Sequence, residues 1–295
     1  MKKLSGAIGV TVTPLLEGDR PNYDEIIRQA DELANSPIDG FFPCSSTGGY
    51  ARLTVEDKLK IMEVVAKTNN GRKVLIAGAC AVSLDEIKLY IDKARELGYD
   101  ACLSCPPYYY PLSQGEVLNY YKEICEYAGD MPIIAYNVPF FTTAIELDTF
   151  KEMLKIKNLV GMKDSSGNMK KISHECDLAR EINPDFIMYT GTDDCLLSAL
   201  VAGCKGSMTA FGAIFPEIIK NIYGYYENGD MAKALNEQYK ILPMLRLADG
   251  LMFPEGYKLV AKACGLKTGD LSPMCDAEKA AALYEAMTKE LERIF

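Results

Sequence analysis

Short apolar runs alternate with longer amphipathic stretches along most of this chain. A helical pattern follows each apolar run, and the runs lie near residues 7–13, 38–44, 73–79, 100–105, 132–136, 159–163, 186–190 and 204–209. They recur at intervals of about 25 to 30 residues, which is the length of one strand–helix unit. Eight such units predict an α/β fold, a (β/α)8 barrel, whose functional residues gather at the carboxyl ends of the strands.

The alternation stops after about residue 215, and only helical patterns follow. Glycine and proline breakers separate four expected helices, which span residues 215–227, 230–248, 254–264 and 275–294. The first helix is expected to close the barrel, and the others to form a bundle that packs on it. We therefore expect a barrel with the active site over residues 1–225 and a C-terminal helical domain over 226–295.

Lys163 is the most informative single residue of the sequence. It ends the apolar run at 159–163 and comes directly before a polar turn at 164–168. An amine at the end of a buried strand is poorly hydrated, which disfavours its charged form and favours the nucleophilic amine that Schiff-base chemistry requires. The alternative is a lysine that reaches into solvent over an exposed turn.

Two further features lie at the same end of earlier predicted strands. Tyr136 ends the run at 132–136, and its phenol could relay protons during imine formation and carbon–carbon cleavage. Residues 45–49, Ser-Ser-Thr-Gly-Gly, offer hydroxyls and backbone N–H groups to a carboxylate. Each could be structural when taken singly, as a core aromatic or a plain turn. Their shared place at one mouth of the barrel predicts a common site.

Four segments resemble, in this order and spacing, the dihydrodipicolinate synthase / N-acetylneuraminate lyase family of pyruvate-handling class I aldolases. They are Ser-Thr-Gly at 46–48, Tyr-Asn-Val-Pro at 136–139, Gly-Met-Lys-Asp at 161–164 and Gly-Thr-Asp-Asp at 191–194. The resemblance runs from about residue 5 to beyond 265. It implies that Lys163 forms an imine with pyruvate or another 2-oxo acid and that Tyr136 shuttles protons. It also implies that Ser46, Thr47 and Gly48 hold the pyruvate carboxylate, and that the reaction uses neither a metal ion nor a bound cofactor.

Residues 107–111, Pro-Tyr-Tyr-Tyr-Pro, resemble the family's aromatic loop after the fourth strand. In the family, a tyrosine of this loop can reach into the neighbouring subunit's site. Tyr109 is the best match and Tyr110 is next, while a rigid surface turn with packed rings remains the alternative, above all for Tyr108. The resemblance implies a homotetramer, a dimer of dimers, in which Tyr109 takes part in catalysis across an interface.

Three departures from the family pattern bear on substrate and regulation. Phe141 stands at a substrate-binding position where the synthase branch carries an arginine for the second substrate's carboxylate, and a phenyl ring cannot make that bidentate contact. Gly49 replaces the usual glutamate, so one polar group of the pocket is missing. The only histidine is His174, so the lysine feedback site of some synthases is not recognisable. Feedback inhibition by lysine is therefore not expected.

The segments 107–113 and 191–194 look closer to the lyase and sugar-acid aldolase branch. There, acidic groups after the seventh strand bind substrate hydroxyls, which makes Asp193 or Asp194 the candidate here; helix capping is the alternative. Gly191 and Ser207 are further candidates for the pocket. The expected substrate is a hydroxylated 2-oxo acid, such as a sialic acid or a 2-keto-3-deoxy sugar acid. The alternatives are 4-hydroxy-tetrahydrodipicolinate synthase, a dehydratase of the family and, from a different class, a non-catalytic 2-oxo-acid-binding barrel.

Composition narrows the partners of such an enzyme. The net charge of −9 argues against a nucleic-acid surface or an anionic membrane as partner. The N-terminus lacks a secretory signal, and no apolar run approaches the ~18 residues of a membrane span, so we expect a cytoplasmic protein. The ten cysteines lack the spacing of a disulfide scaffold and should be reduced core residues. Cys102 and Cys105 should face opposite sides of a strand, which argues against a metal site.

Overall fold

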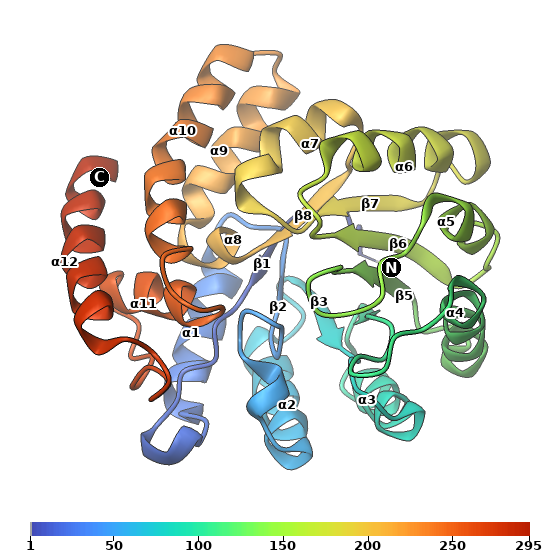
Figure 1. The fold of residues 1–295 in the computed structure, drawn as a ribbon, viewed down its shortest axis with the longest axis horizontal. Coiled ribbons are helices and arrows are strands. Elements are labelled where there is room, and N and C mark those ends of the chain that lie inside the picture. Colours follow the sequence, from blue (N-terminus) through green and yellow to red (C-terminus); the bar gives the residue numbers. More distant parts are fainter. Residues whose placement is uncertain (1) are drawn as a thin grey trace. The chain divides into compact units, whose positions relative to one another are not determined.

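A closed barrel of eight strands organises this computed structural model, which describes residues 2–295 (Figure 1). The strands follow one another in chain order and are β1 (Gly6–Val10), β2 (Gly40–Phe42), β3 (Val74–Gly78), β4 (Ala101–Ser104), β5 (Ile133–Asn137), β6 (Leu159–Asp164), β7 (Ile187–Thr190) and β8 (Gly206–Thr209). Neighbouring strands from β3 to β8 run parallel. The predicted (β/α)8 barrel is confirmed.

A helix follows each strand, and further helices end the chain. The helices between strands are α1 (Tyr23–Asn35), α2 (Val55–Asn69), α3 (Leu84–Glu96), α4 (Gln114–Ala128), α5 (Leu147–Met153), α6 (Met169–Ile182) and α7 (Leu196–Ala202). After β8 come α8 (Ala210–Ile214), α9 (Pro216–Glu227), α10 (Met231–Ala248), α11 (Glu255–Ala263) and α12 (Ala277–Ile294). Short 3-10 turns are η1 (Glu17–Asp19), η2 (Tyr50–Arg52) and η3 (Asp193–Cys195).

The first strands and the start of the helical region differ from the sequence pattern. Strand β2 ends at Phe42 rather than residue 44, because Pro43 has no N–H to continue a ladder. The apolar run at 7–13 likewise yields a strand only as far as Val10. A separate short helix, α8, precedes α9, which begins at Pro216, a residue whose missing N–H suits the first turn of a helix.

Helix α6 follows the polar turn that ends β6. The side chain of Asn168 caps it by accepting a hydrogen bond from the N–H of Lys171 at 3.2 Å. The buried face of the helix is apolar at Ile172, Cys176 and Ala179. Glu175 lies on the same face and is fully buried, which makes it an exception to this pattern.

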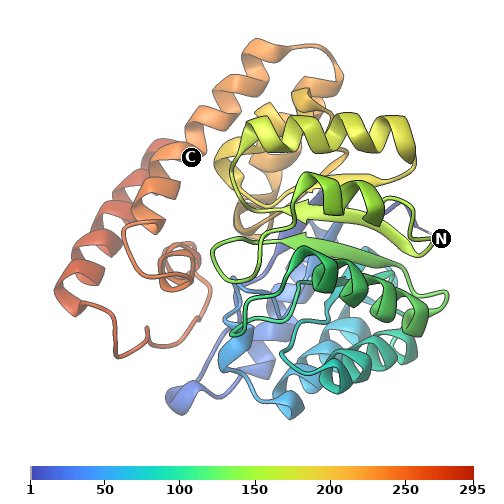
Figure 2. The same cartoon turned by 45° about the vertical axis from the view of Figure 1, so that its right-hand side comes forward.

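The chain forms two compact units by its internal packing. One contains residues 2–8 and Val74–Thr209, and in Figure 1 its helices α3 to α7 run alongside the strands that they connect. The other contains Gly9–Lys73 and Ala210–Phe295; in it α10 packs against α9, α11 and α12, the orange and red helices of Figure 2. The boundary expected near residue 225 stays a prediction.

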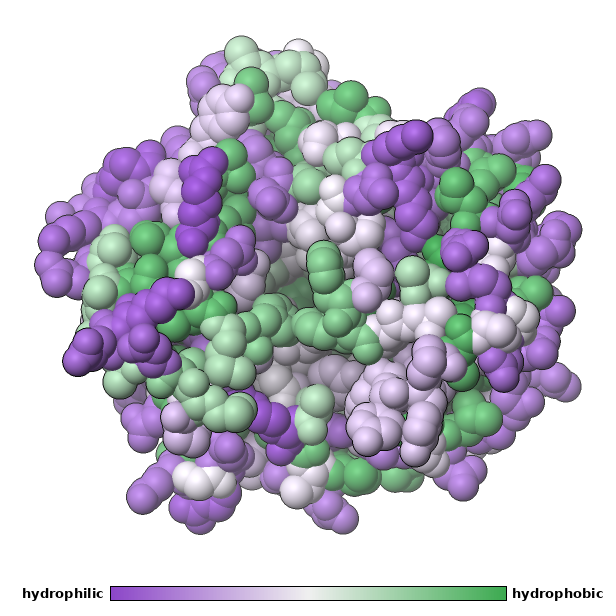
Figure 3. All heavy atoms as spheres, in the orientation of Figure 1, coloured by the Kyte–Doolittle hydropathy of each residue, from purple (hydrophilic) through white to green (hydrophobic). Residues whose placement is uncertain are grey.

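Apolar residues fill the interior, and polar residues lie outside. Strand residues such as Leu103, Ile134, Met162 and Met188 are almost completely buried. Hydrophilic residues dominate the periphery of the face drawn in Figure 3. Within residues 2–295, no helix combines the length and the apolar character needed to cross a membrane.

Candidate active site

Lys163 and Tyr136 are direct neighbours on adjacent strands. The parallel register of β5 and β6 pairs the two residues, and the Nζ atom of Lys163 lies 4.4 Å from the centroid of the Tyr136 ring. Lys163 is 3% exposed and Tyr136 is 6% exposed. Lys163 therefore does not reach into solvent, as the structural alternative would require. The pair thus brings together an amine, which can act as a nucleophile, and a phenol, which can exchange protons, in a buried position.

Ser165 extends this pair into a chain of hydroxyls. Its Oγ donates to the phenolic oxygen of Tyr136 at 3.3 Å. Its backbone N–H donates to the carbonyl of Asn137 at 2.9 Å, which ties the turn after β6 to the end of β5. The sequence analysis did not single out Ser165. The available signal was its place two residues after Lys163, in the same small polar turn.

Gly191 makes room for both of these side chains. A Cβ atom at this position would lie 1.9 Å from Ser165 Oγ and 2.7 Å from Lys163 Cε, and both distances are far below contact. The N–H of Gly191 also donates to the carbonyl of Asp164 at 2.7 Å. Gly191 therefore leaves the space into which the Lys163 side chain extends. Its expected part in substrate binding stays a prediction.

Asp164 clamps the strand ends from the opposite face. Successive strand residues point to opposite sides, so Asp164 turns away from the side of Lys163. Its carboxylate accepts from the side-chain amide of Asn137 and from the N–H of Ser166, the latter at 2.7 Å. Asn137 in turn accepts from the N–H of Ile145 at 2.9 Å. This buried clamp fixes the residues next to Lys163 and Tyr136.

The structure separates the two aspartates that follow β7. Asp193 is buried and Asp194 is exposed. The N-cap positions of η3 and α7 are Thr192 and Cys195, so neither aspartate stands at an N-cap position; both lie in the first turn of η3. Ser207 is fully buried on β8 and pairs with Thr190 in the register of β7 and β8.

Four exposed aromatic residues, which we call the aromatic patch, lie on the loops after β4 and β5. They are Tyr109 (85% exposed), Tyr110 (70%), Phe140 (73%) and Phe141 (51%). The rings of the two tyrosines contact edge to face with centroids 5.0 Å apart, and Tyr109 has a φ of 85°, which is uncommon outside glycine.

Hydrogen bonds hold the two loops of the aromatic patch together. The N–H of Leu112 donates to Thr143 Oγ1 at 2.9 Å, and the amide of Gln114 donates to the carbonyl of Ala144 at 2.7 Å. Tyr108 is half-buried, whereas Tyr109 and Tyr110 are exposed. The loops are therefore ordered, although they present large apolar rings to solvent.

The Ser-Ser-Thr-Gly-Gly loop belongs to the other compact unit. Ser45 orders it: its hydroxyl accepts from the N–H of Gly48 at 3.1 Å and lies 3.3 Å from the carbonyl oxygen of Thr11. Ser46 and Thr47 are half-buried. The loop thus has an internal scaffold residue, Ser45, beside the two that the sequence analysis assigned to carboxylate binding.

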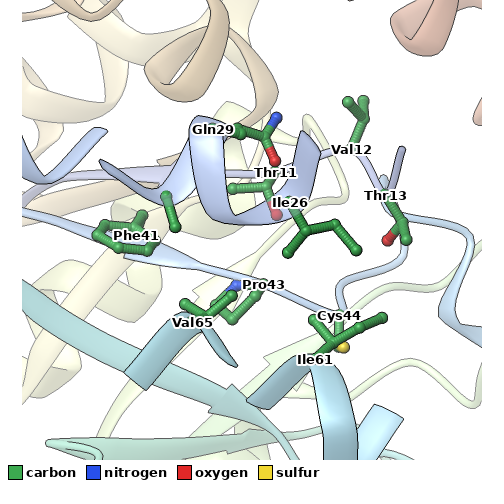
Figure 4. A pocket seen from close by; sticks show the side chains of 11 residues that line it. Thr11, Val12, Thr13, Ile26, Gln29, Phe41, Pro43, Cys44, Ile61 and Val65 are labelled. Atoms are coloured by element: carbon green, nitrogen blue, oxygen red, sulfur yellow. The ribbon is translucent and has the colours of Figure 1, made fainter. Parts of the chain in front are cut away.

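Two glycines give this loop its shape. A Cβ at Gly48 would lie 2.7 Å from Thr13 Oγ1, so only glycine allows this close approach. Gly49 has a φ of 67°, a left-handed conformation that glycine adopts without strain. Thr13 also lines, with Thr11 and Cys44, a cavity of about 10 Å³ (Figure 4). That space suffices for no more than one water molecule, so the cavity is not a substrate pocket.

Cysteines and histidine form no metal centre in the part of the chain that the structure describes. Within residues 2–295, no group of three or more histidine, cysteine, aspartate or glutamate side chains could hold a metal ion. Cys102 and Cys105 are buried and form no disulfide, and burial raises the pKa of the Cys102 thiol to about 12. His174 is exposed on α6.

Comparison with known proteins assigns the family. Residues 3–292 match the model of the Dihydrodipicolinate synthetase family. A 4-hydroxy-tetrahydrodipicolinate synthase of Methanosphaerula palustris is 28% identical over 289 residues, which cover 96% of this chain and 98% of that protein. The fold is that of dihydrodipicolinate synthase from Thermotoga maritima (TM-score 0.91, 22% identity, 99% of both chains covered). N-acetylneuraminate lyase from Mycoplasma synoviae is also similar (TM-score 0.84, 25% identity, 97% of both chains covered).

Proposed function

This chain belongs to the dihydrodipicolinate synthetase family and is an enzyme of its Schiff-base-forming, carbon–carbon lyase type, and from that premise we propose that Lys163 is the imine-forming residue. The observation that carries the proposal is the buried pair of Lys163 and Tyr136 in register at the ends of β5 and β6. The coarse substrate class is a small molecule such as pyruvate.

The chemistry proposed for Lys163 proceeds through an imine and an enamine. The neutral amine attacks C2 of pyruvate, and loss of water gives the imine. Removal of a proton from C3 then gives an enamine, which attacks the carbonyl carbon of an aldehyde. The new carbon–carbon bond forms as the aldehyde oxygen takes up a proton and becomes a hydroxyl group. Hydrolysis of the resulting imine releases the 2-oxo acid, and cleavage follows the same steps in reverse. The covalent imine takes the place of a bound cofactor in this proposal.

Tyr136 and Ser165 are proposed to move the protons. The Tyr136 ring lies beside the Lys163 amine, and the Tyr136 hydroxyl accepts a hydrogen bond from Ser165, so a proton taken up at one oxygen can pass to the next. Ser46, Thr47 and Gly48 are proposed to bind the carboxylate, through the two hydroxyls and the N–H groups of a turn that Ser45 keeps in shape.

We propose a hydroxylated 2-oxo acid, of the sialic acid or 2-keto-3-deoxy sugar acid type, as the substrate. Residues 74–209 contain only two arginines, Arg95 and Arg180, and both pair with aspartates on α3 and α6. No arginine therefore follows β5, where Phe141 stands. The buried Asp193 and Ser207 offer oxygen atoms that suit substrate hydroxyl groups.

The second candidate is 4-hydroxy-tetrahydrodipicolinate synthase, which joins pyruvate to aspartate semialdehyde. It is favoured by the curated relatives that cover nearly the whole chain and carry that name. Following pyruvate consumption with a panel of polyhydroxy aldehydes and with aspartate semialdehyde separates the two candidates. Consumption only with aspartate semialdehyde would replace the first candidate by the second.

The aromatic patch supports an assembly proposal. Tyr109, Tyr110, Phe140 and Phe141 are large rings, each more than half exposed, on two loops that hydrogen bonds join, and exposed apolar surface of this kind marks interfaces. We propose a homodimer in which Tyr109 completes the neighbour's site, two dimers forming a tetramer in the cytoplasm. Exchanging subunits between inactive Lys163→Ala and inactive Tyr109→Phe proteins should then restore part of the activity. Lack of recovery despite exchange would confine Tyr109 to its own subunit.

Trapping of the imine tests the proposed function itself. Pyruvate with borohydride should add one reduced pyruvyl group to the protein, which peptide mass spectrometry should locate on Lys163. Lys157 is a matched control, because it is exposed just before β6, the strand that Lys163 helps to end. Lys157→Ala should keep the adduct and Lys163→Ala should lose it. An adduct that survives Lys163→Ala, or none in the wild type, would contradict the proposal.

A further inference from the structure

Glu175 is a buried carboxyl group that the proposed reaction leaves unused. It lies on α6 with no exposed surface, and neither of its carboxylate oxygens has a hydrogen-bond partner among the residues that the structure describes. Lys171, one helical turn earlier, brings its Nζ to 3.2 Å from Oε1, close enough for an ion pair. Burying a carboxyl group without hydrogen bonds destabilises the folded state, so we expect Glu175 to contribute to function.

Lys171 is shared between two buried carboxyl groups. Its Nζ lies 3.6 Å from Asp164 Oδ2 and 3.2 Å from Glu175 Oε1, and neither carboxyl group is exposed. One ammonium group cannot fully compensate two carboxylates at such distances. Burial, with the charge of Asp164 as a second cause, raises the pKa of Glu175 to about 8 despite the opposing effect of Lys171.

The remaining titratable groups around Glu175 are two thiols. Cys176 is its neighbour on α6, and Cys204 precedes β8; their Sγ atoms lie 3.7 Å apart. The groups that face Glu175 are therefore Lys171 and Cys176 from its own helix, Asp164 from the end of β6 and Cys204. Lys171 is the only cation among these four, so it is the group for which Glu175 and Asp164 compete.

Asp164 links the competition for Lys171 to Lys163 and Tyr136, the reacting groups. It is the residue after Lys163, and it accepts from the side chain of Asn137, the residue after Tyr136. Its carbonyl accepts from the N–H of Gly191, the glycine that makes room for Lys163. A change in the charge balance at Asp164 therefore acts on the strand ends that carry both reacting side chains.

We propose that Glu175 is a positioning residue for the imine chemistry. While Glu175 is neutral, Lys171 neutralises Asp164, and the clamp on the strand ends stays intact. When Glu175 ionises, it attracts Lys171 and leaves Asp164 less compensated, so the alignment of Lys163 with Tyr136 is weakened. The enzyme therefore loses activity on the alkaline side through a group that never touches substrate. This inference rests on the proposed imine function.

Exchange of the pyruvate methyl hydrogens for deuterium tests the proposal without an aldehyde. The exchange reports the imine and enamine steps alone, and NMR follows it between pH 7 and pH 9. The neutral fraction of a group that titrates near pH 8 falls by about tenfold over that range. The ratio of rates at pH 9 and pH 7 should therefore be about tenfold higher in Glu175→Gln than in the wild type. Glu181→Gln, an exposed change on the same helix, should keep the wild-type ratio.

A second variant keeps the test decisive if Glu175→Gln does not fold. Lys171→Gln removes the shared cation, so exchange should be slower at pH 7 and its pH ratio should rise as in Glu175→Gln. Ratios equal to the wild type in either variant would overturn the positioning role. Absence of exchange in the wild type at every pH would be a different result, because it would overturn the imine function and this inference with it.

Discussion

The ends of β5 and β6 and the aromatic patch belong to one compact unit but differ in burial: the side chains at the strand ends are buried, and those of the patch are exposed. Lys163 and Tyr136 are almost completely buried, and the residue after each is held by the bond between Asn137 and Asp164. Tyr109 and Phe140, only a few residues beyond the ends of β4 and β5, are more than 70% exposed. Hydrogen bonds join the two loops of the patch, and its rings are more than half exposed to solvent.

In the proposed assembly, this difference separates the groups that one chain positions by itself from the surface that a second subunit would cover. A reaction shared by a family needs fixed distances between reacting groups, and strands supply them. Selection of an aldehyde and contact with a second subunit need surfaces that another molecule fills. We therefore expect substitutions at the strand ends to affect imine chemistry, and substitutions of Phe140 and Phe141 in the patch to affect specificity and assembly.

Removing the Tyr136 hydroxyl should give the largest loss of turnover. A small loss would contradict the view that the strand ends carry the chemistry. Tyr136→Phe should keep the fold and lower turnover by ~10²- to 10⁴-fold, the usual contribution of general acid–base catalysis. Tyr189→Phe is the matched control: Tyr189 also pairs in register with Lys163, but its hydroxyl donates to the Leu4 carbonyl. Similar turnover of the two variants in a steady-state assay would return Tyr136 to a packing role.

Filling the space at Gly191 tests how closely the strand ends are fitted. Gly191→Ala places a Cβ against Ser165 Oγ and Lys163 Cε, so the amine must move. A displacement of that size should lower turnover by about 10²-fold. Gly115→Ala, where no atom lies within 4 Å of the new Cβ, should leave turnover unchanged. Full activity of Gly191→Ala would show that the lysine has more freedom than the structure indicates.

The buried carboxyl of Glu175 should make the strand-end region sensitive to pH in its stability. Its pKa is raised to about 8, so the folded state keeps a proton that the unfolded state has lost, and stability falls as pH rises from about 4.5 to 8. Between pH 5 and pH 7.5 this costs the wild type about 3 kcal/mol, which Glu175→Gln should not lose. Urea unfolding at both pH values measures the difference; equal pH dependence of wild type and variant would contradict it.

An arginine at position 141 should change specificity without changing pyruvate exchange, with the smallest expected effect. Phe141→Arg offers a carboxylate-binding group, and one charge-assisted hydrogen bond should raise kcat/KM for aspartate semialdehyde by about tenfold. Phe140→Arg, on the neighbouring exposed position, is the control. An equal gain in both variants would mean that Phe141 does not face the aldehyde. A change in pyruvate exchange would mean that patch and strand ends are not separable.

The sequence predicted the parts of this site that depend on strand periodicity. Lys163 and Tyr136 could be placed at one mouth because each ends an apolar run, and the parallel order of the strands then makes them neighbours. The barrel itself followed from the same repeat. Gly49 and Phe141 could be recognised as departures because they interrupt motifs with fixed spacing.

Contacts between side chains of different elements were not predictable from the sequence. The bond from Ser165 to Tyr136 and the competition for Lys171 depend on how a turn and a helix pack on the strands. The choice between Asp193 and Asp194 likewise depends on a single 3-10 turn, which buries one and exposes the other. Sequence periodicity predicts which face of a strand or helix a residue lies on, but it does not identify the residue of another element that its side chain contacts.

Deuterium exchange into the methyl group of pyruvate, measured by NMR without any aldehyde, tests the central claim most directly. The claim is that the strand ends perform imine and enamine chemistry independently of Phe140 and Phe141, the two phenylalanines of the aromatic patch. The wild type and Phe141→Arg should exchange at the same rate, while Lys163→Ala should exchange no faster than buffer. Exchange that survives Lys163→Ala, or that is lost in Phe141→Arg, would contradict the account.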